Sequence, residues 1–321
     1  MTKFAKREYT LELITPAFLG GYDQSAEWRT AGMKALIRQW WRVVYVAEHG
    51  VNVAEMRKAE GLRFGVAAGP KDSHKAAVQI RFDEPPKAPS AIVSGIRGDR
   101  SNALQYLGFG PFVQVDRPSS RLALTAGSSS KIKFKIILKA LNEQQLQQYK
   151  HEIDQTMGLV HQFGTLGSRA SNGWGSVHVS GDLKSDLDLR QYTKTFQACM
   201  TADWKQAIAS DSSGLMLWQS KPYADWESAM RVLKTVRKED QNSLAKSMGL
   251  RPVINGPTLK PRNDHRWPNQ FSFKVIKQGT QFLGQVCLFA HRWHDSNDQR
   301  LDRLLQDVAE QLDQSSLFKR I

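Results

Sequence analysis

Four basic side chains near the N-terminus have the type and spacing to bind an anion. Residues 29 to 42 contain no acidic side chain, and the cations within them are Arg29, Lys34, Arg38 and Arg42. The last three recur every fourth residue, so they share one face of a helix. A guanidinium group can meet a phosphate with two parallel hydrogen bonds. The spacing therefore predicts a helix whose row of cations faces either solvent or the phosphates of a polyanion.

A row of cations that simply faces solvent is one adequate explanation, because the charge repulsion within such a row is small. Like charges four residues apart cost an isolated helix about 0.2 to 0.5 kcal/mol per pair, which a fold can carry without any functional return. Two tryptophans, Trp40 and Trp41, stand between the last two cations of the row. Since the apolar stripe of the helix takes Trp40, we expect Trp41 to lie nearer the cations, where its ring would suit stacking on a base.

A glycine-rich segment, FGTLGSRASNGWGS at residues 163–176, offers a second group of candidate contacts. It follows a predicted helix and precedes a strand, whereas a dinucleotide-binding fingerprint runs from a strand into a helix. A helix cap with a tight turn would need only one or two of its four glycines. The alternative is a loop that lets RNA approach closely, with contacts from Arg169, Ser171, Asn172 and Trp174.

Basic residues also gather in two later segments. Lys131, Lys133 and Lys135 share one face of a predicted strand. There they either form a solvated edge that discourages strand pairing between molecules or add to a basic binding surface. In the second half of the chain, a proline-containing loop has the composition of a platform for single-stranded RNA, with an ordinary solvated loop as the equal alternative. Its candidate RNA-binding residues are Lys260, Arg262 and Arg266.

No catalytic or metal-binding group can be assigned from the sequence. Asp23 follows the first predicted strand, where it can cap its loop or pair with Arg29. His291 and His294 have no acid or thiolate at ligand spacing apart from the distant Cys287, so we interpret them as surface or capping histidines. We therefore expect no catalytic residue, no metal and no cofactor.

Composition favours a polyanionic partner. The 321 residues contain 45 Lys and Arg against 31 Asp and Glu, a net charge of +14, and binding a polyanion would release counterions. Cys199 and Cys287 are too few for a disulfide framework, which fits a reducing compartment. No apolar run approaches the roughly 20 residues that cross a bilayer. We expect a cytoplasmic protein that does not bind membranes.

Two similar domains must position these residues. Residues 1–185 follow the order β, α, β, β, α, β of the ferredoxin-like fold, which RNA-recognition modules also use, with a long loop-rich insertion at about 83–130. The predicted strands are Glu8–Ile14, Leu62–Val66, Val78–Phe82, Lys131–Leu138 and Trp174–Val179, and the predicted helices are Glu27–Glu48 and Asn142–Gln162.

Residues 190–321 predict a second, partial copy of the same unit. The predicted elements are helices at Gln197–Ser210 and Ala224–Met248, strands at Gln270–Lys277 and Gln281–His291, and an amphipathic helix after Asp295. The predicted fold class is therefore α+β, with two ferredoxin-like (RRM-like) domains in tandem and loop insertions.

Several motifs together resemble the RAMP superfamily of CRISPR effector proteins. They are TPAFLGGYDQS at residues 15–25, AEWR at 26–29, GMKALIRQWWR at 32–42 and the glycine-rich segment. The WWR ending of the first helix is most similar to subunit one of the Cmr complex, the type III-B RNA-guided effector. The match covers about residues 8–66 and 160–179. It departs mildly from the family at Ala35, where relatives have a small residue that is often glycine, and at Arg169, which is single where relatives often carry more than one arginine.

This resemblance implies two ferredoxin-like domains that cradle RNA in a basic cleft, within a complex of several subunits. By this analogy the chain would contact guide RNA near its 3′ end and assist the capture of target RNA in antiviral defence, without cleaving it. The helix cations and Arg169, Ser171 and Asn172 would contact the RNA backbone. The alternative is a RAMP endoribonuclease that acts on guide precursor or target RNA, with Asp23 assisting cleavage.

Overall fold

The chain folds into two compact units that are each discontinuous in sequence. The computed structural model describes residues 2–20, 25–66, 73–84, 90–91, 103–108, 122–184, 187–236, 270–292 and 299–321. The N-terminal unit comprises Met1–Val93, Arg121–Ser168 and Gly175–Tyr192, and the C-terminal unit comprises Ser94–Ser120, Arg169–Trp174 and Thr193–Ile321. The tip of the glycine-rich segment thus belongs to the C-terminal unit, although its flanks belong to the N-terminal one.

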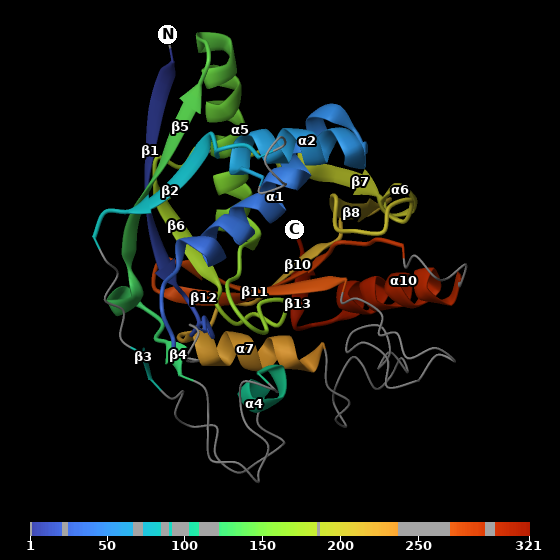
Figure 1. Cartoon of the computed structure of the whole chain (residues 1–321). Helices are drawn as coiled ribbons and strands as arrows, with labels where there is room; N and C mark the ends of the chain where they lie inside the picture. Colours follow the sequence, from blue (N-terminus) through green and yellow to red (C-terminus); the bar gives the residue numbers. More distant parts are fainter. Residues whose placement is uncertain are drawn as a thin grey trace. The chain divides into compact units, whose positions relative to one another are not determined.

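The N-terminal unit is a four-stranded antiparallel sheet in the order β2-β5-β1-β6, with two long helices on one face (Figure 1). The strands are β1 (Lys3–Leu13), β2 (Val78–Phe82), β5 (Ile132–Ala140) and β6 (Val177–Gly181), and the helices are α1 (Thr30–His49) and α5 (Glu143–Phe163). The element order and the central position of β1 between β5 and β6 are those of the ferredoxin-like fold.

Local sequence explains these elements well. In β5 the alternate residues Ile132, Phe134 and Ile136 are buried under the helices, while the residues between them face away. Helix α5 begins where the side chain of Asn142 accepts a hydrogen bond from the backbone N–H of Gln145.

An extra helix, α2 (Val53–Phe64), stands between α1 and β2. The predicted strand Leu62–Val66 is therefore wrong. The side chain of Asn52 accepts a hydrogen bond from the backbone of Glu55, and this pairing of Asn with an acid three residues later marks a helix start that the glycines nearby obscured. The insertion matters for the site because α2 carries an acid toward α1.

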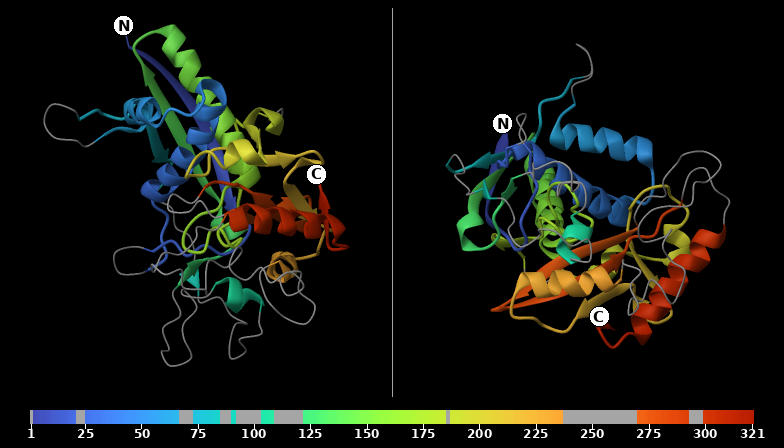
Figure 2. Two further views of the ribbon diagram at one scale, coloured as in Figure 1. Left: turned by 90° about the vertical axis from the view of Figure 1, so that its right-hand side faces the viewer. Right: turned by 90° about the horizontal axis from the view of Figure 1, so that it is seen from below.

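The C-terminal unit repeats the same topology. Its antiparallel sheet has the order β11-β12-β10-β13, and α7 packs along β12 (Figure 2). The elements are β10 (Leu217–Ser220), α7 (Trp226–Thr235), β11 (Phe271–Gln278), β12 (Gln281–Leu288), α10 (Gln299–Gln314) and β13 (Phe318–Arg320). The prediction of two ferredoxin-like folds in tandem is confirmed.

Smaller elements complete the described structure. A three-stranded sheet consists of β7 (Thr193–Thr195), β8 (Ile208–Asp211) and β9 (Gly214–Leu215), and the remaining elements are α6 (Phe196–Cys199), β3 (Ser90–Ala91), β4 (Ala123–Leu124) and α4 (Ala103–Leu107). The predicted helix Gln197–Ser210 is wrong. Only the segment up to Cys199, in α6, is helical, and the last residues of the predicted helix form strand β8. Helix α7 ends at Thr235, and the rest of the predicted Ala224–Met248 helix lies largely outside the described residues.

Candidate nucleic-acid interface

The cations near the start of the chain extend from the residue before α1 to the fourth turn of the helix. Arg29 is the residue that precedes the helix, with extended backbone angles and no side-chain cap, and no acidic residue lies in the first turn. Its side chain is about half exposed and lies 3.5 Å from the carboxylate of Glu27. Lys34, one turn further along, is partly exposed. These two side chains, together with the positive end of the helix dipole, form an environment that favours anions.

Arg38 and Arg42 converge on one carboxylate, that of Glu60 in α2. Arg38 Nε donates to Glu60 Oε1 at 2.7 Å, and Arg42 Nη2 donates to the same oxygen at 2.8 Å. Glu60 is almost completely buried, whereas each arginine side chain keeps 39% of its surface exposed. One acid therefore offsets the repulsion between two neighbouring cations and leaves a net positive charge at the surface.

Both tryptophans of α1 are buried, so the expectation that the Trp41 ring lies beside the cations and can stack on a base is wrong. Trp40 stacks on Phe163 with ring centroids 5.4 Å apart, and Trp41 is completely inaccessible to solvent. The physical reason is that α1 packs against α2 as well as α5, which widens its buried face beyond a single stripe. Trp41 has no exposed ring face for a nucleotide base.

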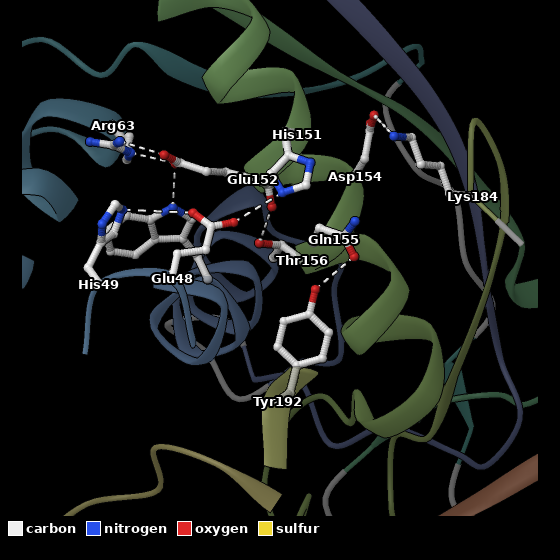
Figure 3. A network of polar contacts seen from close by, with 11 residues as sticks. Glu48, His49, Arg63, His151, Glu152, Asp154, Gln155, Thr156, Lys184 and Tyr192 are labelled. Atoms are coloured by element: carbon white, nitrogen blue, oxygen red, sulfur yellow. Dashed lines mark hydrogen bonds and ion pairs between the residues drawn. The ribbon is translucent and has the colours of Figure 1, made fainter. Parts of the chain in front are cut away.

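The buried side of α1 is fixed by a polar network around Glu152 of α5 (Figure 3). Trp41 Nε1 donates to Glu152 Oε2 at 2.8 Å, and the guanidinium group of Arg63 lies 5.3 Å from the Trp41 ring and 5.0 Å from that of Tyr149. Burial lowers the pKa of Arg63, but its hydrogen bonds and charge interaction with Glu152 outweigh burial and raise it. Arg63 thus stays charged and holds α2, and with it Glu60, against α1.

Two glycines of the glycine-rich segment are required by close packing within the protein, without any ligand. A Cβ on Gly175, whose φ is +64°, would lie 1.9 Å from the carbonyl oxygen of Leu166. A Cβ on Gly167 would lie 2.7 Å from the carbonyl oxygen of Phe18. Close packing of backbone against backbone therefore accounts for these residues, and the interpretation as a tight turn gains support.

Two of the predicted contacts in this segment are engaged inside the C-terminal unit. Asn172 is buried, and its side-chain Nδ2 donates to the carbonyl oxygen of Leu107 at 2.7 Å. The ring of Trp174 is completely inaccessible to solvent and lies edge-to-face against Trp226, with centroids 6.0 Å apart. The segment also pairs with β11, because the backbone N–H of Phe273 donates to the Ser171 carbonyl oxygen at 3.1 Å. These residues position the segment and leave neither the amide nor the ring open to RNA.

Arg169 differs from its neighbours because it is exposed and held in a left-handed conformation. Its φ is +61°, the only positive value among the non-glycine residues of the described structure. Such a conformation costs of order 1–3 kcal/mol at a residue with a Cβ and is found preferentially at functional sites. Ser171 next to it is partly exposed. Arg169 and Ser171 therefore remain candidates for RNA contact.

The other predicted site residues fall into two groups. Lys260, Arg262, Arg266 and Asp23 lie outside the described residues. His291 is buried and its Nδ1 lies 2.9 Å from the Phe289 carbonyl oxygen, and burial lowers the pKa of its imidazole. The interpretation of His291 as a surface or capping histidine is therefore wrong, because the residue is buried beyond the end of β12; His294 lies outside the described residues.

Within the described ranges, no group of His, Cys, Asp or Glu side chains has the arrangement of a metal site. Among the same residues, no helix has the length and apolar character to cross a bilayer. Cys199 and Cys287 are both buried and free.

Sequence reasoning missed the most important partner of the α1 row. Glu60 was overlooked because it lies just before the predicted strand Leu62–Val66, in a segment for which no helix was predicted. A helix starting at Asn52 would have placed Glu60 and Arg63 three residues apart on one face, next to the paired tryptophans.

The chain is similar in fold to known CRISPR proteins. Cmr1 from Pyrococcus furiosus matches with a TM-score of 0.56 and 14% identity over 95% of this chain and 96% of that one. A chain from the type III-B Cmr-beta complex bound to cognate target RNA matches with a TM-score of 0.52 and 12% identity over 96% of this chain and all of that one. No protein-family model matches the sequence, and no curated protein is significantly similar to it. The resemblance to a Cmr subunit-one protein is thus confirmed at the level of fold.

Proposed function

We propose that this chain, which has the fold of Cmr1, is an RNA-binding subunit of a type III-B CRISPR effector complex. The fold similarity to a chain of the Cmr-beta complex extends over almost the whole length of both proteins, which supports a place in such an assembly. The net charge of +14 supports a nucleic acid as the partner within it. The reducing cytoplasm, where both cysteines would stay free, is the compartment we assign.

The observation that carries the proposal is the pair of arginines on Glu60. Glu60 holds two guanidinium groups side by side at the surface, with their remaining N–H groups free of acceptors among the described residues. A guanidinium whose orientation is already fixed loses less side-chain entropy when it binds a phosphate. Arg29 and Lys34 extend the same row toward the start of α1. The row is suited to a sugar-phosphate backbone, which it would hold without reading bases.

We further propose that the chain holds guide RNA near its 3′ end, assists capture of target RNA in antiviral defence and cleaves neither. The resemblance of the first helix and its preceding loop to Cmr subunit one supports this assignment. Other subunits of the effector are its protein partners in this proposal.

Binding of a fluorescent single-stranded RNA to the full chain tests the proposal. The variant should remove both arginines together with Glu60, as Arg38→Gln, Arg42→Gln and Glu60→Gln, because removal of the arginines alone would bury an unpaired carboxylate. Its net charge falls by one, so Arg303→Gln is a matched control. Since each lost charged hydrogen bond is worth about 1.5 to 3 kcal/mol, we expect the triple variant to bind at least about 100-fold more weakly. Equal affinities of the triple variant and the control would contradict the proposal.

Cleavage is tested separately. Labelled guide precursor and target RNA, incubated with the chain with and without Mg²⁺ or Mn²⁺, should remain intact. Cleavage that is lost in an Asp23→Ala variant would instead make the chain a RAMP endoribonuclease.

A further inference from the structure

The face of the N-terminal sheet that points away from α1 and α5 is exposed and carries cations from three neighbouring strands. We call it the basic sheet face and define it by Lys6, Arg81, Lys131, Lys133, Lys135 and Lys139. Strand register places them on one face, because Lys135 of β5 lies opposite Arg81 of β2 and Glu8 of β1, and Lys6 of β1 lies opposite Ile137 of β5. The alternate residues of β5 are buried on the helix side.

Protection of a sheet edge does not explain these lysines. An edge strand gains from lysines because they discourage pairing with another molecule. Strand β5 is an inner strand, hydrogen-bonded to β1 on one side and to β2 on the other. Its lysines must therefore be explained by the face they occupy.

The acids on this face neutralise only half of its cations. Lys6 pairs with Glu8 at 2.8 Å, Lys131 with Glu12 at 3.4 Å and Lys135 with Asp83 at 3.1 Å. A fourth acid, Asp182, accepts a hydrogen bond from the backbone N–H of Glu8. The three cations that remain are all exposed and have no acidic partner among the residues that the structure describes: Arg81, Lys133 and Lys139.

The chemistry of the face fits a phosphate backbone better than a protein. Cores of protein–protein interfaces are depleted in Lys, Glu and Asp and enriched in aromatic residues. The only phenylalanine, tyrosine or tryptophan on this face in the described strands is Phe4, at the far end of β1. The face therefore also lacks the central aromatic rings with which RNA-recognition modules stack bases. Hydrated ammonium groups on an exposed sheet bind phosphates without sequence preference.

We propose that the basic sheet face binds a second stretch of single-stranded RNA backbone, through Arg81, Lys133 and Lys139. The proposal rests on the proposed function in taking RNA as the partner, but it assigns a surface that the α1 row does not include. The contact is electrostatic and independent of sequence, and it extends the length of RNA that one subunit holds.

The salt dependence of RNA binding tests this surface. The sheet variant is Arg81→Gln, Lys133→Gln and Lys139→Gln in the full chain. The control triple is Lys221→Gln, Arg303→Gln and Lys319→Gln, which removes the same charge from exposed positions of the C-terminal unit. For a single strand, each phosphate contact contributes about 0.7 to the slope of log K against log salt concentration. The slope of the sheet variant should therefore be flatter by about 2, with affinity up to about 100-fold weaker near 0.1 M salt, while the control changes little.

A second measurement avoids mutation. Acetylation of the wild-type chain with an N-hydroxysuccinimide ester, read by mass spectrometry, should show that an oligouridylate of about 30 nucleotides protects Lys133 and Lys139 but not Lys221 or Lys319. Equal slopes for the two triple variants, or unprotected Lys133 and Lys139, would overturn the proposal.

The outcomes also separate this proposal from the proposed function. If the wild-type chain binds no RNA, the proposed function fails and this one fails with it. If RNA affinity falls in the triple variant of Arg38, Arg42 and Glu60 but not in the sheet variant, only this proposal fails. A sheet variant that binds RNA normally but does not assemble with other effector subunits would assign the face to a protein partner and overturn the proposal.

Discussion

The guanidinium group of Arg63 and the carboxylate of Glu152 form a buried ion pair with two parallel hydrogen bonds, each 2.5 Å long. Both side chains are at least nine-tenths buried. The pair joins α2 to α5, and Trp41 of α1 donates to the same carboxylate, so three helices of the N-terminal unit meet at one charge pair (Figure 3). Removal of one partner would leave the other charge buried without a counterion.

Glu152→Gln should lower the free energy of unfolding by about 3 to 5 kcal/mol, because Arg63 stays charged and buried without its counterion. The double variant Arg63→Met with Glu152→Gln should recover most of that loss, since glutamine still accepts from Trp41 and no charge is stranded. Urea unfolding followed by tryptophan fluorescence measures both. Glu143→Gln, exposed on the same helix, is the control and should change stability by less than about 0.5 kcal/mol. A double variant no more stable than the single one would contradict this account.

Gly175→Ala should destabilise the N-terminal unit severely. The new Cβ would meet a carbonyl oxygen at 1.9 Å, and φ is already in the left-handed region. Gly50→Ala is the matched control, because its φ is +74° but nothing lies within 4 Å of the added Cβ. The control should lose only the backbone strain of its positive φ, about 1 to 3 kcal/mol, and the Gly175 variant clearly more. Thermal unfolding of the two variants makes the comparison, and equal losses would show that the contact with Leu166 is not tight.

Sequence patterns predicted most of the N-terminal fold because its signals are local and strong. The alternation along β5 and the Asn142 cap are properties of single segments. Strands β10 and β13 were missed for the opposite reason. They are four and three residues long, too short to show a period, and they exist because β12 and β10 offer backbone partners.

The site was predicted less completely because its geometry depends on contacts between segments. The row on α1 was visible as a spacing, but its counterion, Glu60, comes from another helix. Trp41 fits the edge of a one-sided amphipathic stripe, yet it is buried because α1 has two helical neighbours. The lysines of β5 look like edge protection until the strand order places β5 inside the sheet.

Glu60→Gln should move stability and RNA affinity in opposite directions. Glutamine keeps an acceptor between Arg38 and Arg42 but removes the charge that offsets them, so stability should fall by about 1.5 to 3 kcal/mol. RNA affinity should rise roughly threefold to tenfold, because the surface loses a negative charge next to the proposed phosphate contacts. Fluorescence anisotropy and urea unfolding on the same preparation measure the two effects. Glu55→Gln on the exposed side of α2 is the control, and a drop in affinity for Glu60→Gln would mean that its charge is needed for binding.

Two substitutions at Arg169 separate its backbone from its side chain. Arg169→Gly removes the guanidinium and suits the left-handed φ of +61°, whereas Arg169→Ala removes the guanidinium and keeps the strain. The alanine variant should be less stable than the glycine variant by about 1 kcal/mol. Both should bind RNA about 10-fold or more weakly, by the loss of one charged hydrogen bond. Unchanged RNA affinity in both variants would remove Arg169 from the interface, and equal stabilities would contradict the left-handed conformation.

The ion pairs of Arg320 should make the stability of the C-terminal unit fall at acid pH. Arg320 of β13 donates to Asp211 of β8 at 2.5 Å and to Asp313 of α10 at 2.8 Å, and its guanidinium lies 5.1 Å from the ring of Trp218. Burial raises the pKa of Asp211, but hydrogen bonds from Arg320 and the backbone outweigh it and lower the pKa below 3.8. A depressed carboxyl pKa contributes stability that is present above the unfolded value near pH 4 and is lost as the pH falls through the folded value.

Arg320→Gln should therefore destabilise the unit at pH 7 by about 1.5 to 3 kcal/mol and have a smaller effect near pH 3, where the wild type has already lost part of the same interaction. Urea unfolding of both chains at pH 7, 5 and 3, followed by tryptophan fluorescence, measures the difference. Lys319→Gln, one residue earlier and exposed, should leave the pH dependence unchanged. If the effect of Arg320→Gln is the same at all three pH values, the stacking on Trp218, which does not titrate, holds β13 in place and the carboxylates contribute little.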